Sequence, residues 1–183
     1  MNKFQHSVSI KSDRLIVVNY EGARFTTGNM QNIKNNFFRD CGLYPNDILD
    51  QKNKGFIIKY FQNYTIESNK LIIHIKSHGF DTGICELHPE IENSGLLDTL
   101  ITWQELIILF NGLSNSCNDL IVNLGTVCNS ERIKSCKMHM NFDVLVTKSA
   151  VTNPVLPRKL NKELLLNIDN IIVNDGYELI RKK

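Results

Sequence analysis

The sequence lacks any long hydrophobic run. Although 42% of its 183 residues are hydrophobic, no apolar stretch approaches the roughly 18 residues that a membrane-spanning helix needs. The first residues, MNKFQH, also lack the apolar stretch of a signal peptide. We therefore expect a cytoplasmic protein with no membrane-embedded segment.

A strong excess of charge of either sign is absent as well. The chain has 21 lysines and arginines against 19 aspartates and glutamates, which gives a formal net charge of +2. The basic residues are spread along the chain and are not gathered in blocks. Nucleic acid is therefore not an expected partner.

Paired cysteine motifs are missing too. The five cysteines are an odd number with irregular spacing, and they lie at positions 41, 85, 117, 128 and 136. Without an export signal, such cysteines predict thiols and not a disulfide framework. The nearest approach to a zinc motif is Cys128, Cys136 and His139, which lacks a C-x2-C pair and a fourth ligand. We expect neither a metal nor another cofactor.

What the sequence does contain is a regular alternation of predicted strands and helices. No repeat or low-complexity segment interrupts it, and its length fits one domain over residues 1–183 with one sizeable core. Apolar, β-branched runs predict strands at 15–19, 71–75, 120–124 and 142–146, with a weaker one at 47–49. Apolar residues three and four positions apart predict helices at 30–38, 56–64, 102–113 and 159–173. For the last segment the alternative is a hairpin at Asp175-Gly176.

This alternation predicts an α/β fold with a mostly parallel central sheet and helices on both faces, because right-handed crossovers place the helices there. Such sheets bind ligands at the carboxyl ends of their strands. His78 follows the strand at 71–75, and Cys128 follows the strand at 120–124. If these strands are neighbours, both side chains emerge at the same edge of the sheet.

A cysteine and a histidine at one sheet edge are typical of nucleophilic catalysis. A thiol attacks a carbonyl carbon as the thiolate, so it needs a nearby base or positive charge, usually histidine. It also needs donors for the developing oxyanion. Gly79 has no side chain to block its backbone N–H, and the N–H of Cys128 is a second candidate donor.

These motifs resemble the caspase-like superfamily, which includes caspases, metacaspases, gingipain-like peptidases and CHAT peptidases. Its members end one strand in Ser-His-Gly or Gly-His-Gly and a later strand in the nucleophile, and the matching segments here are IKSHG at 75–79 and LIVNLGTVCNS at 120–130. His78 and Cys128 are 50 residues apart, close to the spacing of about 50 in caspases. A third similar segment is IVVNYEG at 16–22, which looks like the first strand and loop of metacaspases. The resemblance spans residues 15–146 and implies a caspase-like three-layer sandwich.

The resemblance implies a cysteine endopeptidase that uses His78 and Cys128 on a peptide or protein substrate, with an activating or recruiting protein as a plausible partner. The segment TVCNS at 126–130 departs from the QACRG of caspases, and Thr126 stands where metacaspases have aspartate. Arg24 lies in the loop where caspases hold the substrate aspartate with an arginine. Arg24 and Thr126 are thus candidate substrate-binding residues with an acidic preference, although Asp81 or Glu86 could supply the missing carboxylate.

Each of these residues also has a purely structural interpretation. Ser-His-Gly at a strand end can be only a turn, and Cys128 can be a packed small hydrophobe. The same interpretation is favoured for the cysteines at 41, 85 and 117, for His74 as a core histidine and for Trp103 as a packing anchor. The alternative function is a catalytically inactive caspase-like interaction or regulatory module.

Overall fold

The computed structural model describes residues 11–20, 30–41, 44–50, 53–85, 99–147 and 177–183. The strands are β1 (Arg14–Tyr20), β2 (Asp47–Asp50), β3 (Ser68–Gly79), β4 (Gly83–Cys85), β5 (Ile101–Thr102), β6 (Cys117–Asn123), β7 (Asp143–Thr147) and β8 (Tyr177–Ile180). The helices are α1 (Met30–Cys41), α2 (Lys54–Gln62) and α4 (Trp103–Leu113), with 3-10 helices η1 (Ser114–Ser116) and η2 (Ser130–Cys136). No helix within these ranges is long and apolar enough to cross a membrane.

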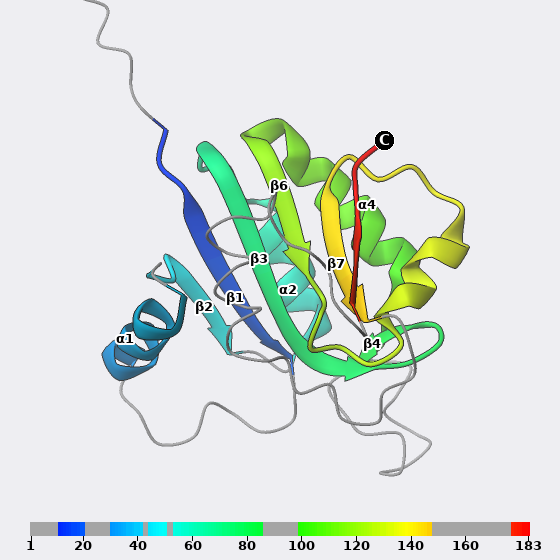
Figure 1. Ribbon diagram of the computed structural model, residues 1–183, viewed down its shortest axis with the longest axis horizontal. Coiled ribbons are helices and arrows are strands. Elements are labelled where there is room, and N and C mark those ends of the chain that lie inside the picture. The colour runs from blue at the N-terminus through cyan, green and yellow to red at the C-terminus, as the bar shows by residue number, and fades with distance from the viewer. Residues whose placement is uncertain (1–10, 21–29, 42–43, 51–52, 86–98, 148–176) are drawn as a thin grey trace, which may run out of the picture.

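The described strands form one mixed sheet in the order β2-β1-β3-β6-β7-β8 (Figure 1). β1 pairs in parallel with β2 and β3, and β6 pairs in parallel with β3 and β7. β8 is antiparallel to β7. Outside this strand order, β4 pairs antiparallel with both β3 and β5. The prediction of an α/β fold with a mostly parallel sheet is confirmed, and β3 and β6 are neighbours.

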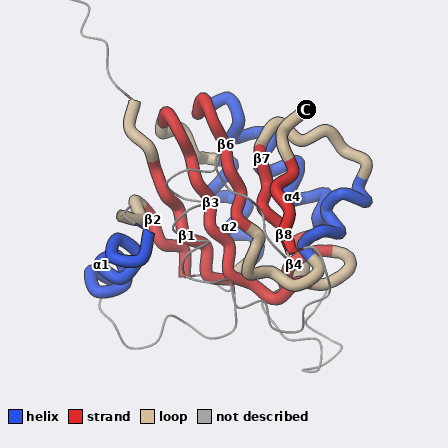
Figure 2. Tube along the Cα trace, in the orientation of Figure 1, coloured by secondary structure: helices blue, strands red, loops and turns tan. Residues whose placement is uncertain are grey.

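One face of the sheet carries the main hydrophobic core. Alternate residues of four strands point to this face and are buried, among them Ile16, Ile73, Val122 and Val144. They pack with side chains of α2 and α4, which both lie behind the sheet in Figures 1 and 2. A helix between parallel strands must return across a face of the sheet, so this packing follows from the connectivity. α1 lies beside β2, at the edge of the sheet.

The start of α4 has a capping box, formed by Thr102 and Glu105. The N–H of Glu105 donates to the hydroxyl of Thr102 at 3.1 Å, and the N–H of Thr102 donates to the Glu105 carboxylate at 2.8 Å. Lys54 Nζ adds an ion pair to Glu105 at 2.8 Å. Trp103 is buried and donates from Nε1 to Asp81 O at 3.0 Å. It is therefore a packing anchor, as expected, and it supports the loop that follows His78.

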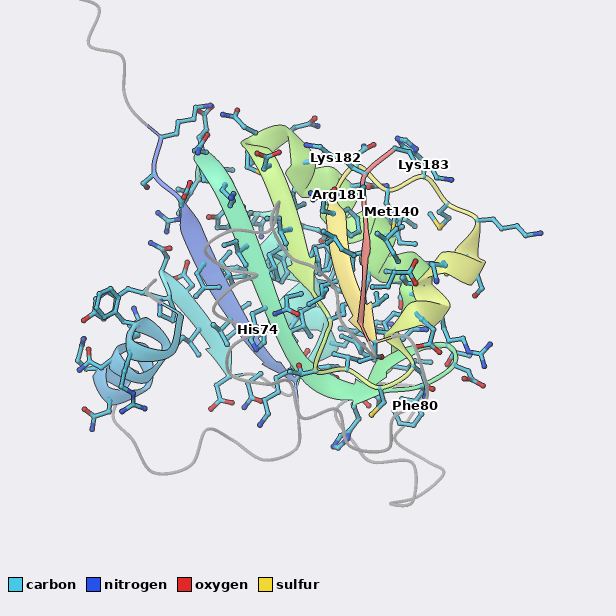
Figure 3. All side chains as sticks on the ribbon, in the orientation of Figure 1. His74, Phe80, Met140, Arg181, Lys182 and Lys183 are labelled. Atoms are coloured by element: carbon cyan, nitrogen blue, oxygen red, sulfur yellow. The ribbon has the colours of Figure 1, made fainter. Side chains whose placement is uncertain are left out.

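The other face of the sheet is also buried along β1, β3 and β6, but it includes polar side chains. His74 is 8% exposed and lies within the sheet in Figure 3. Its Nδ1 accepts a hydrogen bond at 2.9 Å from Nδ2 of Asn123 on β6, and Oδ1 of Asn123 accepts from the N–H of Gly125 at 3.0 Å. The nitrogen and the oxygen of the Asn123 side chain are thus both hydrogen-bonded. Because Asn123 Nδ2 can only donate, Nδ1 of His74 must be unprotonated to accept from it. His74 is a core histidine with a partner, as expected.

Burial, with a smaller contribution from the nearby Lys76, lowers the pKa of His74 from its ordinary 6.5 to about 4. The unfolded chain therefore binds this proton more readily, and the folded state loses stability as the pH falls from 6.5 towards 4. The unfolding free energy is therefore higher above pH 6.5 than below pH 4, and the pKa shift of His74 accounts for about 3 kcal/mol of this difference. We expect His74→Gln to have a flatter pH dependence of unfolding free energy than wild type over this window, measured by urea denaturation.

The exposed His139 offers a matched control for this measurement. His139→Gln makes the same exchange of imidazole for amide on the protein surface, so it measures the effect of the substitution itself on the unfolding free energy. A His74→Gln protein whose unfolding free energy still falls as steeply as that of wild type between pH 6.5 and 4 would show that His74 is not the group responsible.

Several elements differ from the sequence-based expectations. The sequence does not predict strands β4, β5 and β8. Of the apolar residues that predict the helix at 56–64, Ile57 and Phe61 are buried as expected, whereas Phe56 is 45% exposed. The predicted helix at 159–173 and its alternative hairpin at Asp175-Gly176 lie outside the described residues.

Candidate active site

His78 lies at the carboxyl end of β3, near the middle of the sheet. Beyond its parallel pairing with β1 and β6, β3 turns into a short hairpin with β4, closed by a hydrogen bond from Phe80 N to Gly83 O at 2.8 Å. His78 is half-buried, and the register places it opposite Cys85 of β4. In Figure 3, Phe80 lies at the edge of the sheet towards which the arrowheads of β1, β3 and β6 point in Figure 1.

Cys128 lies in the tight loop between β6 and η2. The loop turns through a hydrogen bond from Val127 N to Leu124 O at 2.9 Å, and both of these side chains are fully buried. Cys128 itself is half-buried. Two apolar anchors therefore fix the loop on the core and leave the thiol-bearing residue partly accessible to solvent.

The backbone of Gly79 lies directly against that of Cys128. A Cβ added at Gly79 would overlap the carbonyl oxygen of Cys128, and it would lie 2.7 Å from the Cys128 carbonyl carbon and 2.7 Å from Val127 Cγ1. Only glycine fits at this position, because the obstructing atoms are mainly backbone. The fold therefore brings Gly79, the residue after His78, against the backbone of Cys128 across the neighbouring strands β3 and β6.

The N–H of Gly79 points towards the Cys128 loop. In an antiparallel ladder the N–H and C=O of one residue point to the same side, and that side alternates along the strand. Phe80 directs its N–H to β4, whereas Gly79 O accepts from Asn129 Nδ2 on the opposite side at 3.3 Å. The N–H of Gly79 consequently points away from β4, to the side where Cys128 lies.

Polar contacts on both sides hold the Cys128 loop in place. The hydroxyl of Thr126 donates to Ile75 O on β3 at 3.0 Å, and Asn129 donates to Gly79 O. On the other side, the N–H of Thr147 donates to Ser130 Oγ at 2.8 Å, which links the loop to the end of β7. The loop is thus tied to both strands that flank β6.

The remaining described thiols are in less favourable surroundings for reaction. Cys85 is fully buried and shares a hydrogen bond at 2.9 Å with the hydroxyl of Thr99. Burial raises the pKa of Cys117, with a further contribution from Asp119, and burial also raises the pKa of Cys136. All four cysteines whose side chains are described are thiols, and the side chain of Cys41 lies outside the described part of the chain.

The other predicted site residues have different fates. Arg24 and Glu86 lie outside the described residues. Thr126 is next to the site, but its hydroxyl is used in the contact with β3. Asp81 is 75% exposed at the hairpin tip and lies 3.4 Å from Arg132 Nε. Asp119, which was not assigned to the site, pairs with Lys182 at the opposite edge of the sheet (Figure 3).

The structure offers no support for the weak zinc pattern of Cys128, Cys136 and His139. Across the ranges that the structure describes, no group of three or more histidine, cysteine, aspartate and glutamate side chains is arranged to hold a metal ion.

Sequence reasoning missed the residues that hold the site together, chiefly Asn129, Ser130 and Thr147. Asn129 has a left-handed backbone, with φ of 55°. Asparagine is enriched in this conformation, and its place directly after the candidate nucleophile was an available signal. Nothing local marks Ser130 and Thr147, because their contact joins two different strand ends.

Comparison with known proteins assigns this chain to no family, so its function must be inferred from the geometry of the candidate site. No protein-family model matches the sequence, and no curated protein matches it.

Proposed function

We propose that this protein is a caspase-like cysteine endopeptidase with the three-layer sandwich of that superfamily, in which His78 activates Cys128 to hydrolyse peptide bonds. The observation that carries the proposal is the contact between Gly79 and the Cys128 backbone. It supports a Ser-His-Gly strand end and a cysteine loop that form a single site at the carboxyl edge of a parallel sheet. The half-burial of both residues favours an accessible pair over two packed side chains.

The chemistry follows from the positions of these groups. His78 takes the thiol proton, and Cys128 Sγ bonds to the carbonyl carbon while the π electrons move to the oxygen. The N–H groups of Gly79 and Cys128 stabilise that oxyanion. The imidazolium of His78 then protonates the leaving amine as the C–N bond breaks. Water, deprotonated by His78, attacks the thioester and releases the acid and the thiolate, so no cofactor is required.

Brief, substoichiometric iodoacetamide treatment should label Cys128 faster than any of the other four cysteines. A neighbouring imidazolium stabilises the Cys128 thiolate, whereas burial disfavours the thiolates of Cys117 and Cys136. Peptide mapping by mass spectrometry identifies the labelled thiol. Preferential labelling of Cys41 or Cys136 in the folded protein would argue against Cys128 as the nucleophile.

The proposed substrate preference is acidic, through Arg24. The described part of β1 ends at Tyr20, which is in register with Ser77, the residue before His78, and the resemblance to caspases assigns Arg24 to the loop that follows this strand. A guanidinium binds a carboxylate through two charge-assisted hydrogen bonds. On paired peptides that differ only before the scissile bond, Arg24→Ala should lose roughly 2–5 kcal/mol of transition-state binding for the acidic peptide.

Arg39, an exposed residue of α1, provides the control variant. Arg39→Ala should cleave both peptides as wild type does. Efficient cleavage after lysine or arginine, unchanged by Arg24→Ala, would remove Arg24 from the site and leave the cysteine and histidine roles standing.

A further inference from the structure

Asn129 joins the two segments of the candidate site. It directly follows Cys128, and its backbone adopts the left-handed conformation with φ of 55° and ψ of 17° at the start of η2. Its half-buried side chain crosses to β3, where Nδ2 donates to Gly79 O at 3.3 Å. One residue is thus bonded covalently to Cys128 and by its side chain to Gly79.

Gly79 needs this kind of support. The contact with the Cys128 carbonyl excludes any side chain at position 79, and glycine has the widest backbone freedom of all residues. Rotation about the backbone bonds of Gly79 would turn its N–H away from the position where an oxyanion forms. A hydrogen bond to the Gly79 carbonyl from the neighbouring loop opposes this rotation.

We propose that Asn129 is a positioning residue for the oxyanion site, which acts by fixing the Gly79 backbone against the Cys128 loop. The inference rests on the proposed peptidase function. Asn129 touches neither the substrate carbonyl nor the thiol in this role. Its loss therefore weakens the stabilisation of an oxyanion and leaves the formation of the Cys128 thiolate unchanged.

Two small probes separate these effects. Acetamidoacetaldehyde adds reversibly to a thiolate: a C–S bond forms and the π electrons move to the aldehyde oxygen, whose negative charge the N–H groups of Gly79 and Cys128 stabilise while the His78 imidazolium keeps its proton. Iodoacetamide also forms a C–S bond with the thiolate, but iodide leaves and no oxyanion arises. Aldehyde affinity therefore depends on the oxyanion donors, and alkylation depends on the thiolate alone.

The test uses Asn129→Gly, which keeps the left-handed backbone accessible and removes the amide, and Asn129→Asp, which keeps the shape and replaces the donor by an acceptor. In both variants we expect acetamidoacetaldehyde, measured by protection of Cys128 from iodoacetamide, to bind at least about tenfold more weakly, since loss of a whole donor costs about 10²–10³ in rate. In Asn129→Gly, which adds no charge next to the thiol, the alkylation rate of Cys128 without aldehyde should stay within about twofold of wild type.

Lys137 is the matched control, because it is the other non-glycine residue with a positive φ in the described chain and it lies at the far end of η2. Lys137→Gly should bind the aldehyde as wild type does. Wild-type aldehyde affinity in Asn129→Gly and Asn129→Asp would overturn the proposal, as would a parallel loss of alkylation rate in Asn129→Gly.

Failure of the underlying peptidase function gives a different result. In that case Cys128 of the wild-type protein is no more reactive than the other thiols and takes up no aldehyde. That result would contradict both the catalytic pair and the role of Asn129. If Cys128 of the wild-type protein is reactive and the Asn129 variants bind the aldehyde as wild type does, only the role of Asn129 is contradicted.

Discussion

Replacement of Cys128 by alanine is expected to abolish peptide hydrolysis, and His78→Ala is expected to reduce it nearly as far. The thiol and its base act as one unit, so removal of either lowers kcat by a factor of roughly 10⁴ or more. The measurement is hydrolysis of a peptide library by the purified wild-type protein, followed by kinetics of each variant on the best substrate found.

Cys136 and His139 supply the control variants for this experiment, since both lie in the same region of the chain after Cys128 and neither is assigned a catalytic role. Cys136→Ala and His139→Gln should keep kcat within a few-fold of wild type. Hydrolysis that survives in Cys128→Ala would mean that another residue, or a contaminating protease, performs the reaction.

The second large effect is expected from a single methyl group. Gly79→Ala places a Cβ into the carbonyl of Cys128, and neither backbone can withdraw without breaking the contacts of the loop with β3. We expect a loss of about 1–3 kcal/mol in unfolding free energy from overpacking. The displaced oxyanion donor should lower kcat/KM by about 10² or more. Urea denaturation and hydrolysis kinetics measure the two effects separately.

Gly112 of α4 gives a control with the same chemical change. A Cβ at Gly112 would meet no atom within 4 Å, and alanine is the better helix former by about 1 kcal/mol. Gly112→Ala should therefore be as stable as wild type or slightly more stable, with unchanged kinetics. A Gly79→Ala protein with the stability and activity of wild type would contradict the close packing of Gly79 on Cys128.

The central sheet was predictable because its signals are local. The run at 71–75 has isoleucine at three of its five positions, as expected for a strand buried on both faces, and it forms the middle of β3. The capping box of Thr102 and Glu105 needs only residues three apart, and it is present at the start of α4. Parallel neighbours then follow from the alternation of strands with helices.

The short strands were not predictable by the same means. β4 has three residues and β5 has two, so neither carries a measurable alternation of apolar and polar positions. β8 forms by antiparallel pairing with β7, whose paired residues lie 30 or more positions earlier in the chain. Such strands depend on tertiary pairing and not on local pattern.

The sequence predicts the two segments that carry His78 and Cys128, but it does not predict the hydrogen bonds that hold these segments together. His78 and Cys128 were expected at one sheet edge because both follow apolar runs, and the contact of Gly79 with Cys128 agrees with this expectation. The hydrogen bonds of Thr126 and Asn129 join residues about 50 positions apart. No periodicity marks such pairs, so they emerge only from the folded chain.

The most direct test of the His78–Cys128 pair is the alkylation rate of Cys128 by iodoacetamide at pH 7 in wild type and in His78→Ala, with Cys136 of the same molecule as an internal reference. If His78 stabilises the Cys128 thiolate, its removal should slow alkylation of Cys128 by about tenfold or more and leave the rate at Cys136 unchanged. Equal rates at Cys128 in the two proteins would contradict a catalytic pair and would favour an inactive interaction module.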